Sequence, residues 1–159
     1  MKYMATAEKI FSLNELVSKR QDWNDYKIVF TNGCFDILHL GHVDYLEKAA
    51  SKGDKLIVAI NTDASVSKLK GPNRPINNEN ARARVIAALS FVDAVTFFSD
   101  DTPLTLIKQL KPDVLVKGSD YNISNIVGAD VVMANGGKVE TIELVEGYST
   151  TNIINKITQ

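Results

Sequence analysis

Short apolar segments alternate along the chain with segments that carry helix signals. The apolar runs lie at residues 27–30, 55–60, 94–98, 113–117 and 138–144, and valine and isoleucine are frequent in them. Runs of this length and composition are typical of strands that a parallel sheet buries on both faces. The pattern therefore predicts five strands with helices between them.

Helix signals fill the intervening segments. Val43 and Leu46 recur at helical spacing after Gly41, and Gly53 fits the left-handed residue that follows a helix end. Further helices are predicted near residues 78–91, 103–110, 126–135 and 152–157, whereas the proline- and glycine-containing stretch 68–75 predicts a loop. Ahead of the first strand, a capping box from Ser12 to Glu15 predicts one more helix.

This alternation predicts an α/β fold with one Rossmann-like, doubly wound, parallel five-stranded sheet flanked by helices. We expect residues 27–159 to form this domain and residues 1–26 to form a helical extension packed on it. Ligands of such sheets bind beyond the carboxyl ends of the strands. The unusual stretches TNGCFDILHLGH, LKGPNRP and GSDY each lie after a predicted strand, and GYSTT precedes the last helix.

Composition narrows the class of protein. Hydrophobic residues make up 45% of the 159 residues, and 18 lysines and arginines balance 19 acidic residues. A balanced charge argues against a general nucleic-acid or membrane binder. The single cysteine cannot form an internal disulfide, and the amino terminus lacks the apolar core of a signal peptide. We expect a soluble cytoplasmic domain.

Both histidines of the chain, His39 and His42, lie in the turn between the first strand and its helix. The amino terminus of a helix attracts anions, because its first N–H groups are unpaired and its dipole is positive there. Gly41, between the histidines, permits close approach of a ligand or backbone. Two histidines could also begin a zinc site, but no cysteine or histidine cluster completes it. We therefore predict a phosphate site and no protein-bound metal.

Four further features have both a structural and a functional interpretation. Ser149, Thr150 and Thr151 could cap the last helix, or contact a phosphate. Asp36 could hold the turn by accepting backbone N–H bonds, or contact a ligand directly. The charges of Lys68, Lys70 and Arg74 could be solvated, or form a mobile anion clamp. Arg82 could pair with Glu79 or Asp93 on the surface, or contact a ligand.

These residues carry a family resemblance. GCFDILHLGH resembles the signature of the HxGH nucleotidyltransferase superfamily, and STTNI resembles its second motif. Within that superfamily the chain is most similar to heptose 1-phosphate adenylyltransferases, which occur alone or as the carboxyl-terminal domain of bifunctional heptose kinase/adenylyltransferases. The resemblance extends through LKGPNRPI, FVDAV, DDTP, LVKGSDY, IVGAD and EGYSTTNII, and covers nearly the whole chain. The dinucleotide and Walker phosphate-loop fingerprints are absent.

The resemblance implies transfer of AMP from ATP to D-glycero-β-D-manno-heptose 1-phosphate, for the synthesis of lipopolysaccharide core or a related glycan. His39, His42, Lys70 and Arg82 would stabilise the phosphates, with Mg²⁺ bridging them. Ser149 to Thr151 would lie on the β/γ side, and Gly118, Asp120 and Tyr121 would border the base and ribose. The remaining nucleotide contacts would come from Asn32, Gly33, Cys34, Phe35, Asp36 and Gly41. Relatives also lead us to expect a homo-oligomer.

Two alternatives stay open. Glycerol-phosphate cytidylyltransferases are the nearest, but they carry an arginine in a stretch like RTEGISTT, where this chain has Leu144 to Tyr148. This difference favours the heptose branch over a polyol phosphate and CTP. A nucleotide-binding module without turnover is the second alternative, and the intact motif residues disfavour it.

Overall fold

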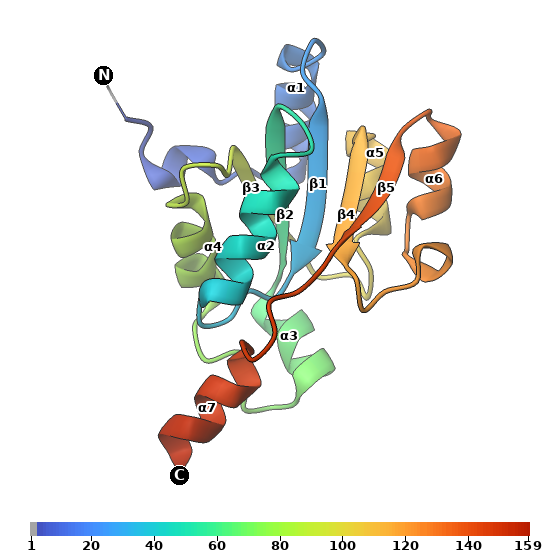
Figure 1. Cartoon of the computed structure of the whole chain (residues 1–159). Helices are drawn as coiled ribbons and strands as arrows, with labels where there is room; N and C mark the ends of the chain where they lie inside the picture. Colours follow the sequence, from blue (N-terminus) through green and yellow to red (C-terminus); the bar gives the residue numbers. More distant parts are fainter. Residues whose placement is uncertain (1–2) are drawn as a thin grey trace.

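The structure, a computed structural model, describes residues 3–159 and contains the expected parallel sheet (Figure 1). Its five strands lie in the order β3-β2-β1-β4-β5, and every pairing is parallel. The strands are β1 (Ile28–Gly33), β2 (Lys55–Asn61), β3 (Ala94–Phe98), β4 (Val114–Gly118) and β5 (Lys138–Ile142). The strand order reverses direction between β1 and β4, so this order places a crevice at the carboxyl ends of those strands.

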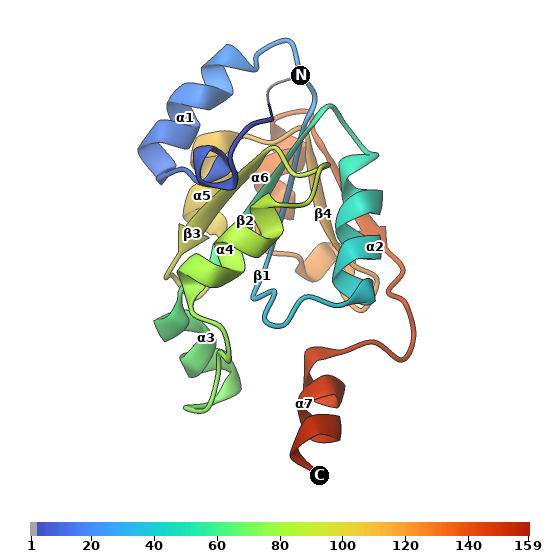
Figure 2. The same ribbon diagram turned by 90° about the vertical axis from the view of Figure 1, so that its left-hand side faces the viewer.

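Helices cover both faces of the sheet, as Figure 2 shows in a second view. The helices α1 (Leu13–Asp22), α5 (Leu104–Leu110) and α6 (Ala129–Ala134) pack on one face. On the other face lie α2 (Leu40–Ala50) and α4 (Glu79–Ala87). Two short 3₁₀ helices, η1 (Thr6–Lys9) and η2 (Ile123–Asn125), complete these layers. The α/β fold predicted from the sequence is confirmed.

The side chains of β1 point alternately to the two faces of the sheet, and each face carries a buried hydrophobic cluster. Ile28 and Phe30 point to the face covered by α1, where they share a buried cluster with Leu16. Val29, between them, points to the opposite face and packs in a cluster with Leu46 of α2. All five side chains are fully buried. Because successive strand residues face opposite sides, one central strand supplies both cores.

Two local predictions were wrong. Residues 68–70, expected in a loop, form the last turn of α3 (Asp63–Lys70), which Thr62 caps by accepting a hydrogen bond from Ser65 N. The chain leaves this helix at Gly71, whose φ is 102°. Gly53 does not adopt a left-handed conformation. It is needed for space, since a β-carbon there would lie 2.6 Å from the carbonyl oxygen of Lys27.

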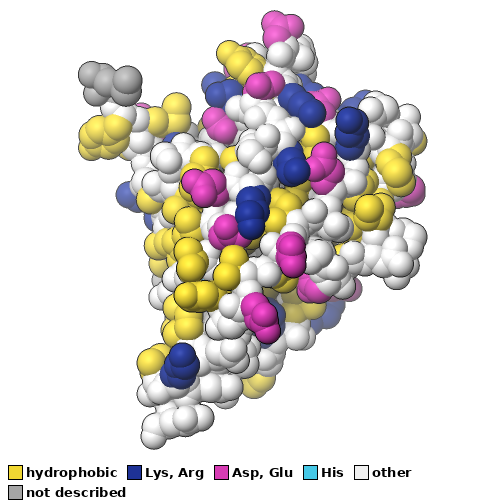
Figure 3. Space-filling view, in the orientation of Figure 1, with side chains coloured by type: hydrophobic (Ala, Val, Ile, Leu, Met, Phe, Trp, Pro, Cys, Tyr) yellow, Lys and Arg dark blue, Asp and Glu magenta, His cyan; other side chains and the backbone are white. Residues whose placement is uncertain are grey.

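The last helix, α7 (Thr150–Thr158), lies beyond the carboxyl edge of the sheet together with α3 (Figure 1). None of its residues is buried. On the face drawn in Figure 3, basic and acidic side chains are interspersed instead of forming a patch of one sign. Within residues 3–159, no helix combines the length and the apolar character that crossing a membrane requires.

Candidate functional site

A pocket of about 760 Å³ opens at the carboxyl ends of β1 and β4, where the sheet order reverses. It brings together almost all of the residues that the sequence nominated. The nominated residues that line it are Asn32, Gly33, Cys34, Phe35, Asp36, His39, Gly41, His42, Lys70, Gly118, Asp120, Tyr121, Ser149, Thr150 and Thr151. Segments more than 100 residues apart in the chain therefore share one site.

The two histidines stack at the start of α2. Their ring centroids lie 3.7 Å apart at an interplanar angle of 22°, and Phe35 meets His42 edge-on at 5.3 Å. Burial lowers the pKa of His39, and burial together with the neighbouring His39 lowers the pKa of His42 to about 4. Both imidazoles are therefore neutral at pH 7, in which form each ring carries one N–H donor.

Gly41 is required by the packing around this pair. A β-carbon there would lie 2.9 Å from the His39 ring and 3.3 Å from the β-carbon of Tyr148. The close approach expected at this glycine is thus made by a histidine ring and by the segment that precedes α7. At Gly41 the histidine turn therefore meets the segment that precedes α7.

Asp36 holds the turn, which is the structural interpretation of this residue. Its carboxylate is buried and accepts hydrogen bonds from Ile76 N at 2.7 Å, Asn77 N at 3.0 Å and Arg74 Nε at 3.1 Å. Burial alone would raise the pKa of Asp36, but these three donors outweigh it and hold the pKa below its usual value. Asp36 therefore fastens the loop after α3 to the histidine turn.

The hydroxyl cluster has two different roles. Ser149 caps α7 by accepting a hydrogen bond from Asn152 N at 3.0 Å, as predicted for one member of the cluster. The Thr150 hydroxyl donates to the backbone carbonyl of Asp36 at 2.7 Å. Together with the close approach of Tyr148 to Gly41, this bond places the amino terminus of α7 beside the histidine turn.

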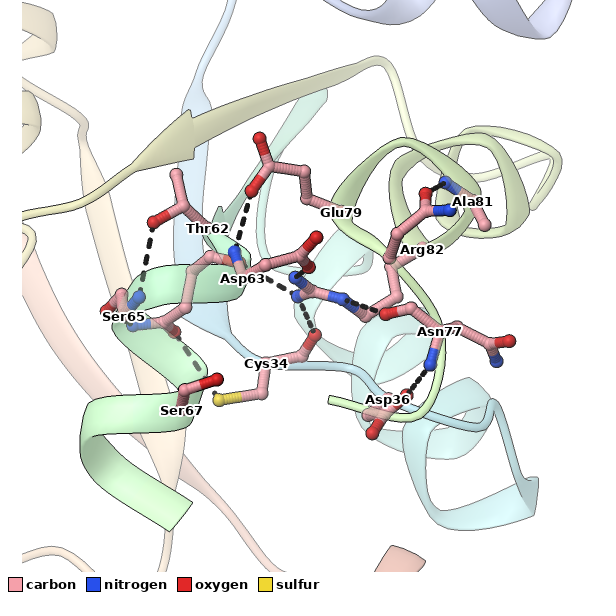
Figure 4. A network of polar contacts seen from close by, with 12 residues as sticks. Cys34, Asp36, Thr62, Asp63, Ser65, Ser67, Asn77, Glu79, Ala81 and Arg82 are labelled. Atoms are coloured by element: carbon pink, nitrogen blue, oxygen red, sulfur yellow. Dashed lines mark hydrogen bonds and ion pairs between the residues drawn. The ribbon is translucent and has the colours of Figure 1, made fainter. Parts of the chain in front are cut away.

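Among the residues that the resemblance assigns to the nucleotide, Arg82 is the one that, within residues 3–159, does not line the pocket. Its side chain is buried beneath the site, and Figure 4 shows how the guanidinium joins several segments. Four of its N–H groups donate to Asn77 O, Cys34 O, Asn61 O and Asp63 Oδ1, at 2.8 to 2.9 Å. The surface pairing considered for Arg82, with Glu79 or Asp93, is not formed among the described residues.

The three cations of residues 68–74, namely Lys68, Lys70 and Arg74, have different partners. Lys70, at the end of α3, lines the pocket, and so does Arg74, which is already paired with Asp36. Lys68 points instead to Asp101 in an exposed ion pair. The pairing of Arg74 with Asp36 could not be predicted from local sequence, because the two residues lie 38 positions apart in the chain.

Several polar residues of the pocket were not predicted from the sequence, among them Tyr45, Asn61 and Lys117. Asn61 and Lys117 lie at or next to the carboxyl ends of β2 and β4. The rule that ligands bind at these strand ends could have identified both. Tyr45 lies within α2, where its spacing is that of a core residue.

The buried histidine makes stability depend on pH. His42 has a pKa of about 4 in the folded protein and an ordinary value of 6.5 when unfolded. Between these values the unfolded state binds more protons, so stability falls as the pH is lowered through this window. We expect wild-type protein to lose about 2 kcal/mol of unfolding free energy from pH 7.5 to 5.

Urea denaturation at the two pH values measures this loss. The His42→Asn variant is the matched control, because it lacks the titrating ring and should lose much less over the same range. Asp36 cannot account for the difference, since its carboxylate is present in both proteins. Equal losses in the two proteins would contradict the assignment.

The site combines features suited to a polyanionic ligand. Two neutral imidazoles, the amino terminus of α2 and the cations Lys70 and Arg74 face one pocket. The hydroxyls of α7 border it from the opposite end of the chain. Fixed donors and dipoles of this kind stabilise charge on phosphates without reorganising during a reaction.

Comparison with known proteins agrees with this geometry. A family model described as cytidylyltransferase-like matches residues 30–156. The bifunctional protein HldE of Ectopseudomonas mendocina is 58% identical over 150 residues, covering 93% of this chain and 32% of the relative. HldE of Methylobacillus flagellatus is 53% identical over 155 residues, with coverages of 96% and 32%. The chain spans about a third of the length of these curated relatives.

Two solved structures resemble this fold. The lipopolysaccharide core biosynthesis protein from Thermoplasma volcanium is 29% identical and superposes with a TM-score of 0.61. The superposition covers 78% of this chain and 99% of that one. Pantoate-beta-alanine ligase from Francisella tularensis, at 19% identity and a TM-score of 0.63, shares the fold over 93% of this chain and 77% of its own. The family model spans most of the chain, and the pocket of the protein contains His39, Gly41 and His42 of the HxGH motif. The chain therefore belongs to the cytidylyltransferase-like family of nucleotidyltransferases.

Proposed function

We propose that this chain transfers AMP from ATP to D-glycero-β-D-manno-heptose 1-phosphate, giving ADP-heptose and pyrophosphate. The observation that carries the proposal is the pocket that the stacked His39 and His42 line together with Ser149 and Thr150. The high identity to the HldE proteins supports the same activity. The product would serve the assembly of lipopolysaccharide core or a related glycan.

The phosphates of ATP would lie across the histidine turn. His39 and His42 would donate hydrogen bonds from neutral rings, and the first N–H groups of α2 would add their dipole. Ser149 to Thr151 would contact the β- and γ-phosphates, and Lys70 would approach from α3. Desolvated donors in fixed positions favour the transition state, in which negative charge builds up around the α-phosphorus.

The reaction needs little proton chemistry. An oxygen of the sugar 1-phosphate attacks the α-phosphorus, and the bond from that phosphorus to the bridging oxygen of the β-phosphate breaks. The bonding pair leaves with pyrophosphate, on the side opposite the attack. Because the attacking phosphate is already ionised at neutral pH, no general base is required, and the protein acts by alignment and charge stabilisation.

The remaining nominated residues receive supporting roles. Gly118, Asp120 and Tyr121 would border the base and ribose, and Asn32 to Asp36 would form the floor and one wall. We propose that Arg82 positions the ends of β1 and β2 without touching ATP, since four of its N–H groups already bond within the protein.

Mg²⁺ would enter with ATP as part of the substrate, bridging phosphate oxygens and offsetting their charge. The one buried carboxylate of the pocket, Asp36, accepts three hydrogen bonds from the protein, so we assign it no metal. Homo-oligomer formation and a cytoplasmic location stay predictions.

A substrate panel scored by pyrophosphate release tests the proposal. Wild-type protein would be incubated with ATP or CTP and with heptose 1-phosphate, other hexose 1-phosphates or glycerol 3-phosphate. We expect the highest kcat/KM for ATP with the heptose 1-phosphate. Preference for CTP and glycerol phosphate would replace the proposal with a cytidylyltransferase, and ATP binding without transfer to any acceptor would indicate a non-catalytic module.

A further inference from the structure

Lys117 lies where β1 and β4 separate. In the described part of the chain these strands pair only through residues 29–30 and 114–115, although both continue toward the pocket. Lys117 follows this last pair by two residues, and on its other side it pairs in register with Thr141 of β5. Lys117 lines the pocket at this crevice, where the strand order reverses and where ligands of such sheets bind.

Side chains hold this crevice open. The carbonyl oxygen of Val116 accepts hydrogen bonds from Thr31 Oγ1 at 3.1 Å and from Tyr45 Oη at 3.2 Å. Those two hydroxyls also lie 2.7 Å from each other, and both residues are buried. A strand pairing that would close the gap is thus replaced by a rigid side-chain network beneath the pocket.

The ammonium group of Lys117 has weak partners in this crevice. Its one hydrogen bond, to the carbonyl of Asn32, is 3.5 Å long, and Nζ lies 5.2 Å from the ring centroid of Tyr121. No carboxylate of residues 3–159 lies within 4.0 Å of it. Beside it, Asn32 Oδ1 is buried without a hydrogen-bond partner among the described residues. A desolvated cation with so few partners is stabilised when an anion binds.

The other cations of the pocket are differently placed. Arg74 is paired with Asp36, and Lys70 projects from the end of α3. The histidines and α7 hydroxyls form the group assigned above to the phosphates of ATP. In-line transfer requires the acceptor to approach from the side opposite the departing pyrophosphate. Lys117, near the end of β4, is a cation of the pocket that is neither paired with a carboxylate of the described residues nor assigned to ATP, so it is available to an acceptor on that side.

We propose that Lys117 binds the phosphate group of the sugar 1-phosphate acceptor and aims its oxygen at the α-phosphorus. The inference rests on the proposed function, because it presumes a phosphorylated acceptor. It adds a binding residue to the acceptor side of the site. The chemistry recognised is a sugar-bound phosphate dianion, for which a compact ammonium is a suitable partner.

Steady-state kinetics of Lys117→Met separate the two substrates. Methionine keeps much of the length and removes the charge. We expect the KM for the heptose 1-phosphate to rise about 10- to 100-fold, as loss of a charge-assisted hydrogen bond predicts, with the KM for ATP within about twofold of wild type. Lys108→Met, an exposed lysine on α5, is the matched control and should leave both values unchanged.

Calorimetric titration of the acceptor into protein saturated with a non-hydrolysable ATP analogue provides a readout without turnover. Weaker acceptor binding by Lys117→Met, with unchanged binding of the analogue, supports the proposal. Weaker binding of the analogue with unchanged acceptor binding would overturn it and assign Lys117 to ATP. A wild-type protein that prefers another sugar phosphate would overturn the proposed heptose substrate alone, and the same titration would then use that acceptor.

A pH profile distinguishes direct binding from a structural role. Burial lowers the pKa of Lys117 to about 8, although Asp120 and Cys34 oppose this shift, and Tyr45 and Tyr121 also lie nearby. Wild-type kcat/KM for the acceptor should therefore fall above about pH 8, as the ammonium loses its proton. Lys117→Arg should keep its activity to higher pH, because arginine stays charged. Identical profiles for the two proteins would contradict the proposal.

Discussion

Replacing His42 with asparagine is expected to lower kcat for adenylyl transfer about 10²- to 10³-fold, the usual cost of removing a donor that stabilises transition-state charge. The ring stacks on His39 at the start of α2 and is neutral in the free protein. It can therefore donate to a phosphate oxygen without first losing or gaining a proton. His39→Asn should have an effect of the same order, since the two rings act on the same group.

Rapid-quench measurement of product formation at saturating ATP and acceptor tests this expectation. The KM for ATP should change far less than kcat, because the donors act mainly in the transition state. Circular dichroism and thermal unfolding at pH 7.5 serve as the folding control, and both variants should retain the wild-type spectrum. Near-normal kcat in both variants would remove the histidines from the mechanism.

Replacing Asp36 with alanine is expected to reduce the free energy of unfolding by about 3 kcal/mol and to abolish most of the activity. The carboxylate is buried and accepts bonds from Arg74 and from the backbone of Ile76 and Asn77. Its removal leaves the mostly buried guanidinium of Arg74 and two backbone N–H groups without their acceptor. The loop after α3 would then detach from the histidine turn.

Urea unfolding and limited proteolysis measure these two consequences. Cleavage should concentrate between residues 71 and 77, where the loop loses its anchor. Asp44→Asn is the matched control for stability, because Asp44 pairs with Lys48 one turn along the surface of α2. Such pairs contribute about 0.3 to 0.5 kcal/mol, so the control should unfold almost as wild type does. A similar small loss in Asp36→Ala would mean that the loop has another anchor.

The strands and the histidine turn could be predicted because their signals are local. The apolar runs at 28–30 and 55–60 are strands in the structure, and His39 and His42 begin a helix as their setting implied. Periodicity of two or 3.6 depends on neighbouring residues alone. Where local signals were weak or in conflict, the prediction failed: no helix was predicted over residues 63–70, and the glycine and prolines at 71–75 led residues 68–70 to be predicted as loop, although α3 covers them.

The roles of individual polar residues depended on contacts that no local pattern contains. Arg82 was expected to touch phosphates, and the structure buries it among carbonyls from the turn after β1, the end of β2 and the loop before α4. The place of Lys117 at a strand end suggests that it lies near a ligand, but no local pattern shows that its ammonium group is desolvated. Its desolvation follows from the separation of β1 and β4.

The sequence by itself determined the parallel fold, the pocket at the strand ends and the two motifs that face each other across it, because these follow from periodicity and from ordered motifs. Only the tertiary structure decided that Asp36 anchors a loop, that Arg82 lies beneath the site and that Lys117 enters the crevice. The reason is physical: burial and pairing of a charge depend on segments distant in the chain, and the energy of a charge depends on both.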